Sequence, residues 1–173
     1  MDQPVCMKAS SQQHNFRFHN LGIGDIQLGR KPEQIPALVS FQRYSRKNSF
    51  IVSPNPSLYQ FFNGDVKVMI ENDDPGLALQ HLFTSINEYG FINRIFLYTR
   101  KTNERLAGRL SQLYGEPKMR KAGHGTQNVW ITESETEITL FSPLFDPDIN
   151  QVISFRFFHD LPALKEYIIE GRT

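Results

Sequence analysis

The sequence predicts an α+β protein in which largely antiparallel sheets are packed by a few helices. Three observations support this fold class. Residues 91–99 are rich in β-branched and aromatic side chains, which is typical of a strand. Residues 103–115 carry leucines at helical spacing and end at a glycine. Several short strand-like segments follow one another with few helices between them, which favours an α+β fold over a doubly wound α/β fold.

The segment from Phe91 to Pro117 gives the clearest signal in the chain. Its strand has apolar side chains on both faces, which predicts a position in the middle of a sheet with something covering each side. The two faces carry Phe91, Ile95 and Leu97, and Ile92, Phe96 and Tyr98.

A helix is expected directly after this strand. Asn103 can accept a hydrogen bond from a free backbone N–H and so cap the helix start. Gly115 can adopt the left-handed conformation that closes a helix, and Pro117 prevents the helix from resuming. The side chains predicted to share the buried face are Leu106, Leu110, Leu113 and Tyr114.

Length and composition bound the class of protein. The chain has 173 residues, and we expect a single compact domain over 16–173 after a flexible arm at 1–15. Lysine and arginine total 19 against 18 aspartate and glutamate, so the near-neutral charge argues against nucleic-acid binding. No segment reaches the roughly 20 apolar residues that a membrane-spanning helix needs.

The N-terminus and the cysteine content leave the compartment open. The first residues have neither the basic region nor the apolar region of a signal peptide. They fit either the native start of a cytosolic protein or an exported chain whose signal was replaced by an initiator Met. Cys6 is the only cysteine, so no intramolecular disulfide can form. The charged fraction of 21% and the abundance of Asn, Gln, Ser and Phe favour export.

The first half of the chain begins with short elements. Residues 16–20 and 26–28 are expected to be brief strands. Pro32 is expected to start one or two helical turns, which Pro36 interrupts. A further strand is expected at 50–53.

A hairpin and a helix are expected next. Asn63-Gly64 tolerates the two positive φ angles of a type I′ turn, and strand-like segments at 58–62 and 66–70 flank it. Asp74 with Pro75 is expected to start a helix that Gly90 ends. Its predicted inner face is Ala78, Leu79, Leu82, Phe83 and Ile86, with His81 on the solvated side.

The chain after the central helix is expected to form a loop, a second hairpin and a last strand. The loop, residues 118–127, is polar and contains glycine. The hairpin pairs 129–132 with 137–141, and the last strand is 152–158. Asp160 is expected to cap a final helix.

The two halves of the chain, 16–90 and 91–173, share this order of elements. The order suggests a duplicated β-α-β-β-β-α unit. Residue identity between the halves is negligible, and a chance arrangement of the same elements would give the same order.

The sequence contains no catalytic or metal-binding pattern. There is no G-x-S-x-G nucleophile motif, and Cys6 has no local partner. The five histidines never stand at i, i+4 spacing or in a Cys/His cluster, as a zinc site requires. We therefore expect no catalytic residue, no metal and no cofactor.

Two kinds of binding residue are candidates. Charged loops with aromatic residues beside them can form a protein interface, because tyrosine and arginine are favoured at hot spots. The candidates for partner binding are Glu71, Asp73, Asp74, Tyr44 and Tyr59. The alternative is a glycine-containing loop that binds an anion through backbone N–H groups and the side chains of Arg120, Lys121 and His124.

The second half of the chain resembles small bacterial α+β proteins of the inhibitor and toxin-immunity kind. The resemblance rests on LSQLYGEP at the helix end, followed by VWIT, EITLF and VISFRFF. It implies a non-catalytic protein that binds and blocks a partner protein, often in the bacterial periplasm. From another class, the alternative is a small enzyme or anionic-ligand-binding protein that uses the loop around His124.

Overall fold

The protein is an α+β protein dominated by antiparallel strands, as the sequence predicts. The computed structural model describes residues 14–36, 38–40, 58–61, 66–69, 77–100, 102–144 and 150–157. The elements are β1 (His14–His19), β2 (Gly22–Ile23), β3 (Ile26–Gln27), η1 (Pro32–Gln34), β4 (Leu38–Ser40), β5 (Leu58–Phe61), β6 (Val66–Met69), β7 (Leu77–Ile86), β8 (Ile92–Thr99), α3 (Leu106–Tyr114), β9 (Lys118–Ala122), β10 (Gly125–Ile131), β11 (Thr136–Pro143) and β12 (Val152–Phe157). Within these residues α3 is the one α-helix.

The strands form one continuous hydrogen-bonded path. Its order is β3-β2-β1-β6-β7-β8-β12-β11-β10-β9, with β5 also paired to β7 and β4 to β5. Every pair is antiparallel except β1 with β6. The predicted central strand, β8, lies between β7 and β12. Its position in the middle of the sheet is therefore confirmed.

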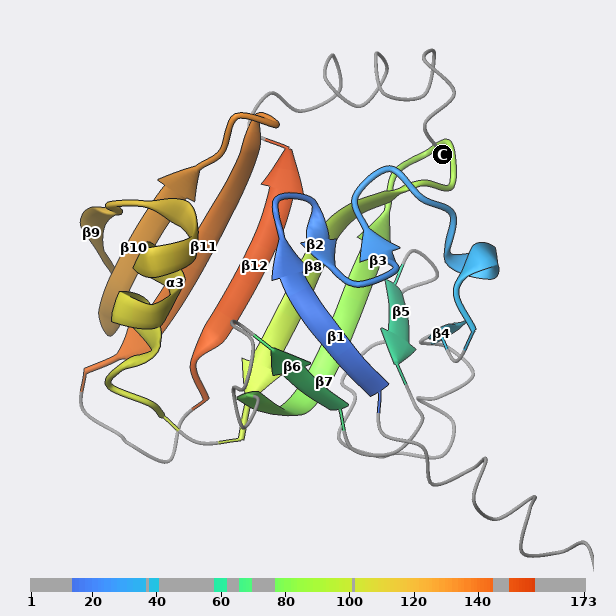
Figure 1. Cartoon of the computed structure of the whole chain (residues 1–173). Helices are drawn as coiled ribbons and strands as arrows, with labels where there is room; N and C mark the ends of the chain where they lie inside the picture. The colour runs from blue at the N-terminus through green and yellow to red at the C-terminus, as the bar shows by residue number, and fades with distance from the viewer. Residues whose placement is uncertain are drawn as a thin grey trace, which may run out of the picture.

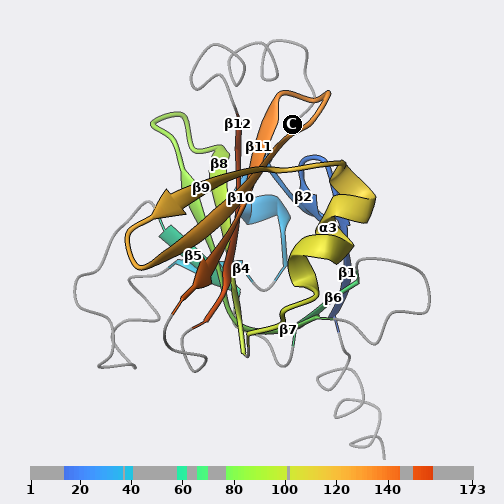
Figure 2. The ribbon, with the colours of Figure 1, turned by 90° about the vertical axis from the view of Figure 1, so that its left-hand side faces the viewer.

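The core lies between the broad sheet of β7–β12 and the elements on one side of it. Helix α3 and the strands β1–β3 lie on that same side (Figures 1 and 2). Because directly opposed residues share a face of a sheet, two rows of the register define what we call the core face. The rows are Leu82, Leu97, Ile153 and Leu140, and Thr84, Ile95, Phe155, Ile138 and Trp130, all of them buried. Phe18 of β1 packs on this face, with its ring centroid 6.1 Å from that of Phe155.

The start of α3 differs from the sequence prediction at its cap and at one leucine. Asn103 Oδ1 accepts a hydrogen bond from the backbone N–H of Arg105 at 2.9 Å, which forms a turn before the helix. The N-cap residue is Arg105, which makes no side-chain capping bond, so the predicted cap at Asn103 is wrong. Leu106 and Leu110 are fully buried, as predicted. Leu113 is 41% exposed, so its predicted place in the core is wrong.

The end of α3 is tied to two strands. The Tyr114 hydroxyl donates to the carbonyl of His19 at the end of β1, at 2.8 Å. The indole N–H of Trp130 in β10 donates to the carbonyl of Gly115, also at 2.8 Å. Gly115 ends the helix with φ +93° and ψ −165°. The predicted glycine at the helix end is confirmed, but its ψ lies outside the left-handed helical region. These bonds fix the helix over the core face.

The helix predicted to end at Gly90 is wrong, because the described part of that segment, from residue 77 to 86, is strand β7. The register against β8 shifts by one residue between Leu79 and His81, so the strand contains a β-bulge. The bulge changes the spacing of the buried side chains from two to three, and this spacing imitates a helical face. The buried residues of β7 are Leu77, Leu79, Leu82 and Thr84.

The predicted type I′ hairpin is also wrong in its pairing. Strands β5 and β6 form where the sequence predicts them, but they do not pair with each other. Strand β7 has ten residues and takes both as neighbours, β6 at Leu77 and Ala78 and β5 at 83–85. Asn63-Gly64 itself lies outside the described residues.

Residues 118–127, predicted as a loop, form strand β9 and the start of β10. A two-residue turn, Gly123-His124, joins them, and Ala122 lies opposite Gly125. Gly123 has φ +57°, as the first position of a type II′ turn requires. The next hairpin, β10 with β11, confirms the second predicted hairpin, and β12 confirms the predicted last strand.

The remaining predictions for single elements have mixed outcomes. Strand β1 begins at His14, inside the expected arm, and η1 is a single turn, after which Leu38 starts β4. The expected strand at 50–53 and the helix capped by Asp160 lie outside the described residues. Because β7 replaces an expected helix, the duplicated unit is not confirmed.

Candidate functional site

The second face of the broad sheet carries aromatic side chains that are only half-buried on β7 and β8, whereas Val129, Thr139 and Glu137 on the same face of β10 and β11 are buried. We call it the open face. Its aromatic cluster is His81, Phe83, Phe96 and Tyr98, all of them half-buried. The register sets His81 opposite Tyr98 and Phe83 opposite Phe96. Along one row, the cluster continues through Val152 and Phe141, which are also half-buried.

Three rings of this cluster pack against one another. The centroids of Phe83 and Tyr98 lie 5.7 Å apart with planes at 89°, an edge-to-face arrangement. The His81 ring lies 5.6 Å from Phe83 and 6.2 Å from Tyr98. Burial among these rings, and secondarily the charge of Arg100, lower the pKa of His81 below its usual 6.5. The imidazole is therefore neutral at neutral pH, and the cluster is an uncharged surface.

Arginines border the aromatic cluster. Arg94 is exposed and stands directly opposite Arg156, the next residue in its row of the register. Arg156 Nη2 lies 2.8 Å from the carboxylate of Glu137, whose side chain is only 5% exposed. Within the described part of the chain, Arg94 makes no ion pair. Arg94 and Arg156 face one carboxylate, that of Glu137, so this edge of the cluster carries an excess of positive charge. Like charges placed opposite each other in a sheet are destabilising.

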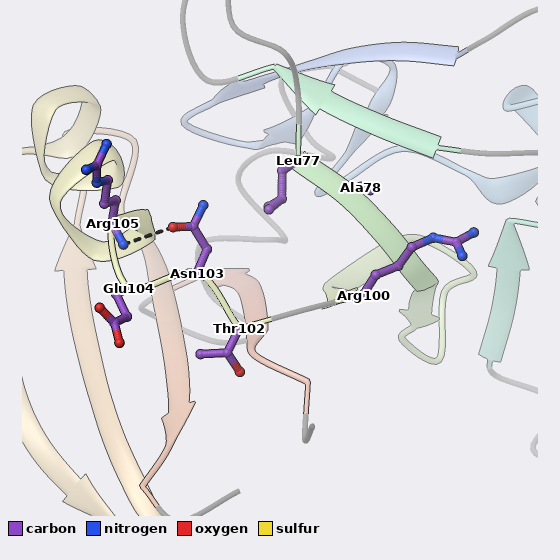
Figure 3. A pocket seen from close by; sticks show the side chains of 7 residues that line it. All are labelled: Leu77, Ala78, Arg100, Thr102, Asn103, Glu104 and Arg105. Atoms are coloured by element: carbon purple, nitrogen blue, oxygen red, sulfur yellow. Dashed lines mark hydrogen bonds between the residues drawn. The ribbon is translucent and has the colours of Figure 1, made fainter. Parts of the chain in front are cut away.

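A pocket lies between the start of β7, the end of β8 and the start of α3 (Figure 3). Its volume is about 530 Å³, and its charged lining residues are Arg100, Glu104 and Arg105. In Figure 3 the guanidinium groups of Arg100 and Arg105 point away from each other. The arrangement does not focus positive charge on one point, so it makes a poor anion site.

A second pocket shares Thr102 and Glu104 with the first and reaches Gln151, with a volume of about 420 Å³. Gln151 is buried, and both ends of its amide are hydrogen-bonded: Oε1 accepts from the backbone N–H of Asn103 at 2.7 Å, and Nε2 donates to Ser142 Oγ at 3.0 Å. These bonds join the start of α3 to β11. We therefore assign Gln151 a structural role.

The described residues contain no candidate metal site and no candidate membrane-spanning helix. No three or more His, Cys, Asp or Glu side chains there lie close enough together to hold a metal ion. Among the helices of those same residues, none is both long and apolar enough to cross a membrane.

The predicted partner-binding residues are almost all outside the described residues. Glu71, Asp73, Asp74 and Tyr44 fall there, so their role stays a prediction. Tyr59 is in β5, where its backbone pairs with Ser40 of β4 and Thr84 of β7.

The predicted anion-binding residues are not brought together. Arg120 and Lys121 are adjacent in β9 and so project to opposite faces, while His124 is in the turn. Arg120 Nε–H donates to Gln127 Oε1 at 2.7 Å, and its Nη2 lies 3.6 Å from the Glu137 carboxylate. Arg120 is thus engaged on the open face. Anion binding at these residues stays a prediction.

The aromatic cluster was missed by sequence reasoning because two of its members were assigned to a helix. The run Gln80 to Ile86 contains Phe, Thr and Ile, which favour strands. This content of strand-favouring residues was the available signal for β7. The pairing of His81 with Tyr98 depends on the register between β7 and β8, which could not be derived from the sequence alone.

Comparison with family models, with curated proteins and with solved structures finds no match to this chain. The resemblance to inhibitor and immunity proteins therefore stays a prediction. The function has to be argued from the geometry of the open face.

Proposed function

We propose that the protein is a non-catalytic binding module of inhibitor or immunity type, which binds a partner protein through the open face and blocks it. The observation that carries the proposal is the half-buried aromatic cluster bordered by arginines on β8 and β12. Aromatic side chains and arginine are the residues most enriched at interface hot spots.

The geometry of the cluster suits a partner better than a small ligand. The rings stand on neighbouring strands of a sheet, so they are held rigidly and lose little conformational freedom on binding. The described pockets lie elsewhere, around Thr102 and Glu104, and lack convergent charged groups. A broad, preorganised surface of this kind is typical of a protein interface.

The charges on the open face define the kind of partner. Arg94 and Arg156 oppose each other, and Glu137 offsets only part of that charge. A partner with acidic residues around an apolar centre would pair with the arginines and cover the rings. Such pairing relieves the repulsion between the two arginines and speeds association.

The test uses the full-length chain as bait against a lysate of its native host, with mass spectrometry to identify a stoichiometric partner. Tyr98→Ala should then weaken binding of that partner by about 2 kcal/mol, or about thirtyfold in Kd, measured by calorimetry. The matched control is Tyr89→Ala, since Tyr89 is 51% exposed in the turn between β7 and β8, away from the cluster. A partner that binds both variants equally well would exclude the open face as the interface.

A second variant tests the charge without disturbing the rings. Arg94→Glu should slow association and reduce the salt dependence of the rate. Lys31→Glu changes the net charge by the same amount at an exposed residue outside the open face and should leave the rate almost unchanged. Thermal melts of all four variants verify that each remains folded at the assay temperature.

A further inference from the structure

Strand β9 is the last strand of the sheet and has an unpaired edge in the described structure. It pairs with β10 on one side, and within the described residues no strand pairs with its other side. In Figure 1 it forms the border of the sheet next to α3. Four of its five residues, from Lys118 to Lys121, are exposed. An exposed edge of this kind can accept a further strand from another chain.

The turn between β9 and β10 determines which backbone groups of β9 point to its free edge. Ala122 and Gly125 flank a two-residue turn, so they form a hydrogen-bonded pair. Hydrogen-bonded and non-hydrogen-bonded pairs alternate along an antiparallel ladder. The backbone N–H and C=O groups of Met119 and Lys121 therefore point away from β10. These four groups are in position to bond an added strand.

The side chains of β9 indicate which residues a strand added at the free edge should have. Lys118 and Arg120 project to the open face, opposite Val129 and Gln127 of β10. Met119 projects to the core face and is 70% exposed, although its neighbour across the ladder, Asn128, is buried. Lys121 adds a third positive charge, and the strand contains no acidic residue.

We propose that the free edge of β9 accepts an extended acidic segment of the partner as an added antiparallel strand. The proposal rests on the proposed binding function and names the form in which part of the partner binds. Acidic residues of the segment lie opposite Lys118 and Arg120, and an apolar residue between them covers Met119.

The same charges disfavour the other obvious occupant, a second copy of this chain. Two β9 strands that pair edge to edge would place lysine and arginine opposite lysine and arginine, which is destabilising. Lysine on edge strands is a common means of preventing such self-association. An acidic strand turns that repulsion into attraction, so the edge discriminates between the two occupants.

The probe is a short blocked peptide in which glutamate and valine alternate, titrated into the full-length protein. Binding is followed by amide chemical shifts, which should change most at Met119 and Lys121. A peptide with lysine in place of glutamate should bind at least about tenfold more weakly, which corresponds to 1.4 kcal/mol. The glutamate peptide methylated on the backbone nitrogens of its valines should not bind. The valines lie opposite Met119 and Lys121, so their N–H groups are the ones that strand pairing with β9 needs.

Two variants of the protein complete the test. Met119→Pro removes an N–H that points to the free edge and should abolish binding of the glutamate peptide, while the melting temperature stays nearly unchanged because no bond to β10 is lost. Lys118→Glu places a carboxylate opposite a glutamate of the peptide and should weaken binding about tenfold. Lys31→Glu is the control of equal charge change and should bind the peptide as the unaltered chain does.

The outcomes separate this inference from the proposed function. Equal binding of the methylated and unmethylated peptides, or of the lysine and glutamate peptides, would overturn strand addition at β9. Unchanged binding by Met119→Pro would overturn it as well. If the partner is lost in Tyr98→Ala but kept in Met119→Pro, the open face binds it and the β9 inference is wrong. Loss in both variants, with Tyr89→Ala unaffected, supports both.

Discussion

Leu110 gives the sharpest test of the packing of α3, because the same helix supplies a matched leucine. Leu110 has no exposed surface and lies between the helix and the core face. Replacing it with alanine removes about three carbon groups, or roughly 2.5 kcal/mol of transfer free energy at about 0.8 kcal/mol each. The cavity left in a rigid core adds to this, so Leu110→Ala should lower the free energy of unfolding by about 3–5 kcal/mol.

Leu113 is 41% exposed on the same helix, so its truncation leaves a surface that water fills. Leu113→Ala should cost less than about 1 kcal/mol, and both changes carry the same small gain in helix propensity. The assay is denaturant unfolding followed by the fluorescence of Trp130, the only tryptophan, which is buried. Equal losses at the two leucines would show that the structure has the wrong face of α3 against the core.

Two further predictions test the turn of β9 and the aromatic cluster. Gly123→Val should destabilise the protein by at least about 1 kcal/mol in a thermal or denaturant melt, because φ +57° is unfavourable for a β-branched residue. The control is Gly108→Ala, in a helix with open space around the added methyl, which should stabilise the protein by about 0.5–1 kcal/mol. A Gly123→Val variant with unchanged stability would argue against the turn. The lowered pKa of His81 means that the unfolded chain binds more protons, so stability should begin to fall as the pH drops below about 6.5 and level off below the folded pKa. The fall should be smaller in His81→Gln, and identical pH profiles would place His81 in solvent.

The elements predicted correctly are those whose signals are local. Strand β8 has a run of β-branched and aromatic residues, and the turn at Asn103 and the positive φ of Gly115 bound α3 within a few residues. The hairpin of β10 with β11 needs only neighbouring residues to form. In each case the free energy that selects the structure comes from side chains close in sequence, so the pattern is visible without the fold.

The errors arise where distant residues decide the structure. Strands β5 and β6 lie close in sequence, yet each pairs with β7, because that longer strand offers backbone groups to both. Strand β9 carries three basic residues and one large apolar side chain, Met119, and so resembles a loop in sequence. It is nevertheless a strand because it pairs with β10 along one edge, and its side chains need no burial. An exposed edge strand has no hydrophobic period by which to find it.

The β-bulge in β7 links the largest error of sequence reasoning to the candidate site. If the alternation that buries Leu77 and Leu79 continued without a shift, His81 and Phe83 would turn to the core face and Leu82 to the other. The extra residue at Gln80 reverses this, and its side chain is held by Asn150, whose Nδ2–H donates to Gln80 Oε1 at 2.6 Å. The bulge therefore completes the core with Leu82 and at the same time brings the His81 and Phe83 rings beside Tyr98. The same β-bulge therefore explains why β7 was predicted as a helix and how the rings of the proposed binding face come together.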